Sequence, residues 1–256
     1  LARRTAGLTG ADLANIANEA AIFAARHNQS YIRQGDFEGA MERVLTGLQK
    51  RRVVTEKEKR ILAYHEGGHA LVAYLMGDVM PVQKVTIVGR GDALGLAYYL
   101  PVEDRYLHTK EELIDVMKVA LAGRAAEEIV FGEITTGASN DIEKATGTAR
   151  KMVTEFGMSE RVGAVRLGQG GGEPFLGRDA SHERNYSDQV AYVVDEEVRR
   201  LMDQAHDEAY DILTENRVVL DRLIETDVQR IVAEHGHEPV IDGVRDAVAA
   251  GLDRLF

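Results

Sequence analysis

Apolar side chains recur every three or four residues along most of this chain, which is the spacing that gathers them on one face of an α-helix. The longest stretches with this spacing are 57–76, 111–131 and about 185–216, and a shorter one follows the last. Gly132, directly after the second stretch, is a typical helix end. The pattern therefore predicts a mainly α-helical protein.

The first 50 residues have the pattern of a small helical unit. Thr9 can cap a helix that runs to Asn28, and a second helix begins at Asp36 and ends at Gly47. One face of the first helix carries mostly small apolar residues, which allow close packing: Leu13, Ile16, Ala17, Ala20, Ala21 and Ala24. On physical grounds alone this unit is a helical hairpin without chemistry of its own.

After Pro81 the spacing changes to that of β-strands. Residues 82–88 and 94–100 are rich in Val, Ile, Leu and Tyr, and a Gly-Arg-Gly-Asp turn at 89–92 separates them. We predict a β-hairpin or two edge strands. An extended peptide can add to such an edge through main-chain hydrogen bonds, so a strand within about 83–100 is a place where a polypeptide substrate can align.

Composition narrows the class of protein. The 256 residues, 45% of them hydrophobic, are enough for one or two domains with a sizeable core. The net charge of −11 argues against nucleic acid as a partner, because nucleic-acid binders carry a basic surface. The chain has no Cys, which suits a reducing compartment and leaves only His, Asp and Glu as metal ligands. No run is long and apolar enough for a membrane span. The first residue is Leu1 rather than Met, and a helix start follows already at Thr9, so we expect a fragment of a longer protein.

The residues with the clearest chemistry lie in the helix predicted at 57–76. His65 and His69 are four residues apart, which brings both rings to one helical face where they can bind one ion. Together with Glu66 they form the His-Glu-x-x-His pattern of zinc peptidases, in which Zn²⁺ activates a water molecule and the Glu takes its proton. Gly67 and Gly68 are unfavourable inside a helix, which indicates a packing or functional reason for them.

A catalytic zinc site needs a third protein ligand, and three residues are candidates. Glu127 and Glu128 stand near the end of the helix at 111–131, and some zinc peptidases use a Glu on a second helix. Asp141 follows Ser139 and Asn140, either of which looks like an N-cap. A late-helix Glu pair is usually solvated, and an Asp in a first helical turn usually serves the helix dipole. Spacing alone does not choose among the three.

Other features carry less chemistry. The Gly-rich stretch 167–174 has the composition of a flexible flap. Two further histidines, His182 and His206, lack the spacing of metal ligands. His235 and His237 have such spacing but lie in a polar tail, and we do not expect this pair to be a metal site.

Five stretches together resemble the FtsH family of membrane-anchored AAA+ zinc proteases. They are Thr9-Gly-Ala-Asp-Leu-Ala-Asn-Ile-Ala-Asn-Glu-Ala-Ala, Tyr64-His-Glu-Gly-Gly-His-Ala-Leu-Val, Leu121-Ala-Gly-Arg-Ala-Ala-Glu-Glu-Ile-Val-Phe-Gly-Glu, Thr135-Thr-Gly-Ala-Ser-Asn-Asp-Ile and Arg184-Asn-Tyr-Ser. The resemblance covers roughly residues 1–225 in order, and several long motifs are far more specific than His-Glu-x-x-His alone.

The resemblance implies an organisation for the chain. Residues 1–50 are similar to the helical lid that follows an AAA+ ATPase core, and residues 51–226 to a mostly helical zinc-metallopeptidase domain with a small β element. Residues 227–256 form a tail of uncertain role. The family is membrane-anchored, with this part on the cytoplasmic or an equivalent reducing side. It works as a homo-hexamer that degrades unfolded or membrane proteins, driven by ATP hydrolysis.

The resemblance also implies roles for single residues. The Asp of the Ser-Asn-Asp-Ile motif completes the metal site in this family, so Asp141 joins His65 and His69 as a zinc ligand. Glu66 is then the general base. Glu127 and Glu128 become helix residues that support the site from outside the ligand set.

The chain departs from the family in a few respects. It lacks the phosphate-binding loop of the ATPase core and the membrane segments, so ATP and the membrane concern parts outside this chain. Gly67 stands where the family usually has Ala, which should loosen the helix without changing the ligands. Two alternatives remain, a stand-alone peptidase that needs no ATP and a hexamerising scaffold with a structural metal. Glu66 argues against the scaffold, because a structural site needs no base.

Overall fold

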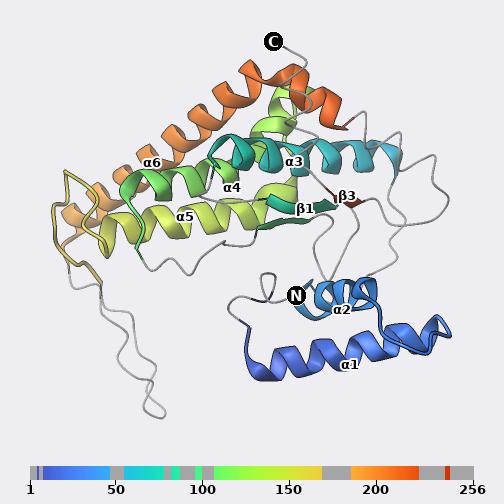
Figure 1. Cartoon of the computed structure of the whole chain (residues 1–256). Coiled ribbons are helices and arrows are strands. Elements are labelled where there is room, and N and C mark those ends of the chain that lie inside the picture. Colours follow the sequence, from blue (N-terminus) through green and yellow to red (C-terminus); the bar gives the residue numbers. More distant parts are fainter. Residues whose placement is uncertain are drawn as a thin grey trace. The chain divides into compact units, whose positions relative to one another are not determined.

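The computed structural model describes residues 5, 8–46, 55–77, 82–86, 96–99, 107–168, 186–224 and 240–242 (Figure 1). The chain divides into two compact units, one of residues 1–106 with 217–256 and one of residues 107–216. The predicted mainly α-helical fold is confirmed. Within the described residues, no helix is both long and apolar enough to cross a bilayer.

The first unit begins with the predicted pair of helices, α1 (Gly10–Arg26) and α2 (Gln34–Thr46), which pack against each other. Thr9 and Asp12 form a capping box at the start of α1, in which each main-chain N–H donates to the other side chain. Ile16, Ala20, Ala40 and Met41 form the buried contact between the two helices. Local caps and a small apolar face are thus sufficient to define this pair.

Helix α3 (Glu56–Leu75) carries the histidine motif, and Thr55 caps it in the same way through Glu58. Residues 63–73 of α3 are all buried, polar ones included. A helix that is buried on all sides within one stretch has packing partners around its circumference. Strands β1 (Val82–Thr86) and β2 (Leu96–Tyr99) and a helical segment at 217–224 belong to the same unit.

The small sheet has three strands in the order β2-β1-β3, with both pairs antiparallel. Both predicted strands are confirmed within the described residues, and the turn predicted at 89–92 lies outside them. Strand β3 (Val240–Asp242) was not predicted, and Ile241 pairs with Val85 of β1. Residues from the tail of the chain therefore complete a sheet that lies beside α3.

The second unit contains α4 (Lys110–Phe131), the 3₁₀ turn η3 (Thr136–Ala138), α5 (Ser139–Thr154) and α6 (Asp188–Glu215). Helices α4, α5 and α6 pack on one another around a shared apolar core (Figure 1). Gly132 ends α4 in the left-handed region at φ 67°, as the sequence predicts.

The predicted N-cap of α5 at Ser139 or Asn140 is wrong. Ser139 already has helical backbone angles, because η3 runs directly into α5 and the Ser139 N–H donates to the Thr136 carbonyl. The cap position falls to Ala138, whose side chain offers no hydrogen bond. The start of α5 is therefore held by contacts other than a side-chain cap of its own.

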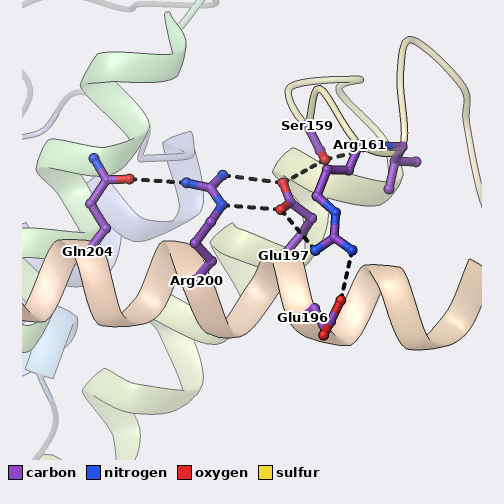
Figure 2. A network of polar contacts seen from close by, with 7 residues as sticks. Ser159, Arg161, Glu196, Glu197, Arg200 and Gln204 are labelled. Carbon is purple, nitrogen blue, oxygen red and sulfur yellow. Dashed lines mark hydrogen bonds and ion pairs between the residues drawn. The ribbon is translucent and has the colours of Figure 1, made fainter.

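The loop after α5 is held to α6 by a polar network (Figure 2). Its centre is Glu197, only 1% exposed, whose carboxylate accepts hydrogen bonds from the Ser159 hydroxyl (2.7 Å) and from the Arg200 guanidinium (3.1 and 3.2 Å). Arg161 binds the neighbouring Glu196 at 2.8 Å. The Arg200 hydrogen bonds are the main cause that lowers the pKa of Glu197, against the opposing effect of burial.

Candidate metal centre

The two motif histidines lie as their spacing predicts. His65 and His69 are 5% and 6% exposed, and their Nε2 atoms are 3.1 Å apart. The rings meet edge to face, with centroids separated by 4.7 Å. Both imidazoles therefore turn the same nitrogen toward one point, which is how two histidines on one helical face chelate a metal ion.

Glu66 lies between the two histidines in sequence and is 6% exposed. A carboxylate is costly to bury unless hydrogen bonds or positive charge compensate for it. Glu66 is therefore a packed residue of α3, not a solvated surface carboxylate.

Asp141 lies in the first turn of α5, with a side chain 19% exposed and 3.5 Å from the Lys144 ammonium. One ligand atom from each of His65, His69 and Asp141 lies within 4.8 Å of the other two. Two imidazoles and one carboxylate are a donor set that fits Zn²⁺ in a catalytic site, where three protein ligands leave a position for water.

The other two candidate ligands make different contacts. Glu127 is 1% exposed, and its carboxylate accepts hydrogen bonds from the main-chain N–H and the hydroxyl of Thr135. Glu128 is exposed, with an oxygen 3.4 Å from Nε2 of His206. Neither carboxylate joins the group of His65, His69 and Asp141.

Tyr64 ties the motif helix to the segment 217–224. Its hydroxyl donates to Asp221 at 2.9 Å, and Asp221 also accepts from Arg217 at 2.9 Å. The guanidinium groups of Arg60 and Arg217 each lie 5.9 Å from the Tyr64 ring centre. Burial and, after it, the hydrogen bond to Asp221 raise the pKa of Tyr64.

Gly67 allows the same segment to approach α3 closely. A Cβ atom at this position would be 2.6 Å from Cδ1 of Ile224 and 3.3 Å from Cδ1 of Leu220. The sequence indicated a packing or functional reason for a Gly here, and the structure gives a packing reason. Neither Tyr64 nor Asp221 stood out in the sequence, because 157 positions separate them and no local pattern links them.

Some predicted features fall where the structure gives no description. Of the Gly-rich stretch 167–174, only the first two residues are described. His182, His235 and His237 also lie outside the described residues, as do Arg184 and Asn185 of the last family-like motif.

Known proteins match this chain in two segments. The pattern of peptidase family M41 matches residues 52–235, and the pattern of the AAA+ lid domain matches residues 1–39. The first match contains His65, Glu66, His69 and Asp141, and the second contains all of α1.

Individual relatives give the same result. The chain is 50% identical over 238 residues to the ATP-dependent zinc metalloprotease FtsH of Rubrobacter xylanophilus, a match covering 92% of this chain and 37% of that protein. It is 51% identical over 228 residues to the protein of the same name from Bacillus subtilis, covering 88% of this chain and 36% of that protein. For the Mycobacterium leprae protein of this name, identity is 51% over 245 residues, covering 95% of this chain and 31% of that protein.

The chain thus spans about a third of the length of the curated relatives that it matches. The M41 match alone covers well over half of the 256 residues. The resemblance to the FtsH family is confirmed, and the chain belongs to peptidase family M41.

Proposed function

We propose that this chain is a zinc endopeptidase that cleaves peptide bonds in extended polypeptides. The observation that carries the proposal is the pair of buried imidazole nitrogens 3.1 Å apart, and Glu66, the residue after His65, is buried as well. His65 and His69 would hold Zn²⁺ together with Asp141, whose ligand atoms lie within 4.8 Å of theirs. Bound Zn²⁺ polarises a scissile carbonyl and lowers the pKa of a water molecule.

The chain's own residues then perform the proton transfers. Glu66 accepts the proton of the attacking water and delivers it to the nitrogen of the leaving amine. Burial of Glu66 keeps bulk water from competing for this proton. The presence of Glu66 at this position disfavours the alternative of a purely structural metal, since a structural site does not need a base.

The sheet supports a way of holding the substrate. In the described sheet β1 is central, because it pairs with β2 on one side and β3 on the other. A substrate strand could therefore add only to an outer strand, and β2 is the outer strand within the predicted 83–100 region. Main-chain pairing is independent of side chains, which suits a protease acting on unfolded or membrane proteins of many sequences.

The name that these relatives share, ATP-dependent zinc metalloprotease, supports the wider setting. We propose that an ATPase core outside this chain feeds substrates to it, that residues 1–50 are the lid of that ATPase, and that residues 51–226 form the peptidase domain. We further propose assembly as a homo-hexamer and anchoring to a membrane, with this part on the cytoplasmic or an equivalent reducing side. A stand-alone peptidase without ATP dependence is the alternative.

The test compares the purified chain with Glu66→Gln and Asp141→Ala. We expect near-stoichiometric zinc in the parent and in Glu66→Gln, and loss of zinc in Asp141→Ala, measured by elemental analysis. Hydrolysis of a short fluorogenic peptide should be sensitive to chelators in the parent and lost in Glu66→Gln. Glu111→Gln, an exposed residue in the first turn of α4, is the control for the charge change.

Two results would contradict the proposal. Cleavage by Glu66→Gln at the parent rate would show that Glu66 is not the general base. Full zinc retention by Asp141→Ala would remove this Asp from the ligand set. Peptide cleavage without ATP by the chain, combined with full casein degradation, would favour the stand-alone peptidase.

A further inference from the structure

We infer that Glu127 is a positioning residue, which sets the start of α5 and through it the carboxylate of Asp141. This inference rests on the proposed role of Asp141 as a metal ligand. It is carried by contacts within one compact unit, between the last turns of α4 and the first turn of α5.

The Glu127 carboxylate is buried and held by Thr135. The residue is 1% exposed, which is rare for Glu unless its oxygens are satisfied. The main-chain N–H of Thr135 donates to one oxygen at 2.6 Å, and the Thr135 hydroxyl donates to the other at 3.2 Å. One carboxylate thus binds both donors of a single residue eight positions later, which fixes the chain path after Gly132.

Thr135 in turn holds the start of η3. The Thr135 hydroxyl also accepts a hydrogen bond from the Gly137 N–H at 3.2 Å, so it caps the 3₁₀ turn. A Cβ atom at Gly137 would be 3.2 Å from the Thr135 hydroxyl oxygen and 3.8 Å from Oε1 of Glu127. The turn therefore lies close to both the Thr135 hydroxyl and the Glu127 carboxylate.

The turn η3 connects directly to the first turn of α5, which contains Asp141. The turn continues without a break into α5, whose N-cap Ala138 provides no side-chain hydrogen bond. The two hydrogen bonds from Thr135 to the Glu127 carboxylate, which we call the clamp, therefore fix the chain just before α5, where no side-chain cap is present. Asp141 stands in the first helical turn, three residues after Ala138, so a shift or fraying of this turn moves its carboxylate directly. Groups that orient metal ligands from outside are known to affect metal affinity.

The test uses Glu127→Ala, Glu127→Gln and Thr135→Val in the full chain, with Glu133→Gln as the control. Glu133 is exposed and lies in the same connection, so its substitution removes the same charge without touching the clamp. We measure the zinc dissociation constant by competition with a chelator and the visible absorption spectrum of the cobalt-loaded protein. The thermal unfolding of the metal-free protein is recorded in parallel.

We expect Glu127→Ala to weaken zinc binding by about 10–100-fold and to change the cobalt bands, which report ligand geometry. Glu127→Gln should partly rescue both, because its amide oxygen still accepts from the Thr135 N–H and its NH₂ can donate to the hydroxyl. Thr135→Val should have a smaller effect, because the main-chain bond remains. Glu133→Gln should equal the parent.

A merely structural clamp gives a different result. It lowers the unfolding temperature of the metal-free variants while the zinc dissociation constant and the cobalt bands of the folded protein stay as in the parent, and this overturns the inference. If Glu127→Ala does not fold, Glu127→Gln and Thr135→Val decide by the same readouts. Zinc retention by Asp141→Ala contradicts the proposed ligand set, whereas zinc loss in Asp141→Ala with unchanged Glu127 variants contradicts only this inference.

Discussion

Replacing Gly67 by Ala tests whether the segment 217–224 packs as closely on the motif helix as the structure shows. A Gly inside a helix is destabilising by about 1 kcal/mol relative to Ala. Gly147, in the middle of α5, has no atom within 4 Å of a built Cβ. Gly147→Ala is therefore the matched control and should stabilise its helix by about 0.5–1 kcal/mol.

At Gly67 the stabilisation of the helix by Ala is opposed by a steric clash. The new Cβ would be 2.6 Å from Cδ1 of Ile224, whereas carbon atoms in contact prefer about 3.5–4.0 Å. Relief requires the Ile224 side chain to move by about 1 Å, and overpacking of this kind costs about 1–3 kcal/mol. We expect Gly67→Ala to change the free energy of unfolding by between zero and about 2 kcal/mol in the destabilising direction.

Ile224→Val separates the two contributions, because it removes the Cδ1 atom that the new Cβ meets. Alone it should cost about 0.5–1.5 kcal/mol, as the loss of a buried methyl group does. Combined with Gly67→Ala it should cost less or restore stability, which gives a coupling energy of about 1–2 kcal/mol.

The assay is urea denaturation of the metal-free protein, followed by far-ultraviolet circular dichroism and by tyrosine fluorescence to test for a single transition. Additive effects of the two substitutions within about 0.5 kcal/mol would refute the close approach. So would a gain at Gly67 as large as that at Gly147.

Two further predictions concern the polar contacts. Tyr64→Phe should lower the free energy of unfolding by about 1 kcal/mol, since one hydrogen bond is lost while Asp221 keeps Arg217; equal stability in urea denaturation would contradict this. Because the pKa of Glu197 is lowered in the folded state from its usual 4.5, this carboxylate stabilises the fold above about pH 4.5 and the contribution is lost as pH falls through the folded-state value. Thermal unfolding from pH 6 to pH 3 should therefore show the parent losing stability faster than Glu197→Gln, and parallel curves would contradict the assignment.

Much of the helical fold could be predicted from the sequence because its signals are local. The predicted 57–76 helix runs from Glu56 to Leu75, and Gly132 ends α4 as expected. The start of α5 was misplaced because it depends on Glu127, a residue of the preceding helix. Strand β3 escaped prediction because its partner β1 lies more than 150 positions away, and a three-residue strand has no periodicity to detect.

The candidate site divides in the same way. Two histidines four residues apart share a helical face whatever the rest of the fold does, so their proximity followed from spacing. The third ligand did not, since Glu127, Glu128 and Asp141 were equally allowed until family resemblance singled out the Asp. The contacts that hold the motif helix, such as Tyr64 with Asp221, arise only when distant parts of the chain fold together.

One face of the motif helix packs against the segment 217–224 and another carries the two histidines. This arrangement explains why glycines, which are unfavourable inside a helix, are tolerated there. At about 100° per residue, Tyr64 and Gly67 share one face, and both contact the segment 217–224. The midpoint of the face that carries His65 and His69 lies about 150° away, roughly two-fifths of a turn. Close packing on the first face thus fixes the rotation of the helix about its axis, and with it the direction in which both imidazoles point. Substitutions on the Gly67 face should therefore alter stability first and metal affinity only when the helix turns.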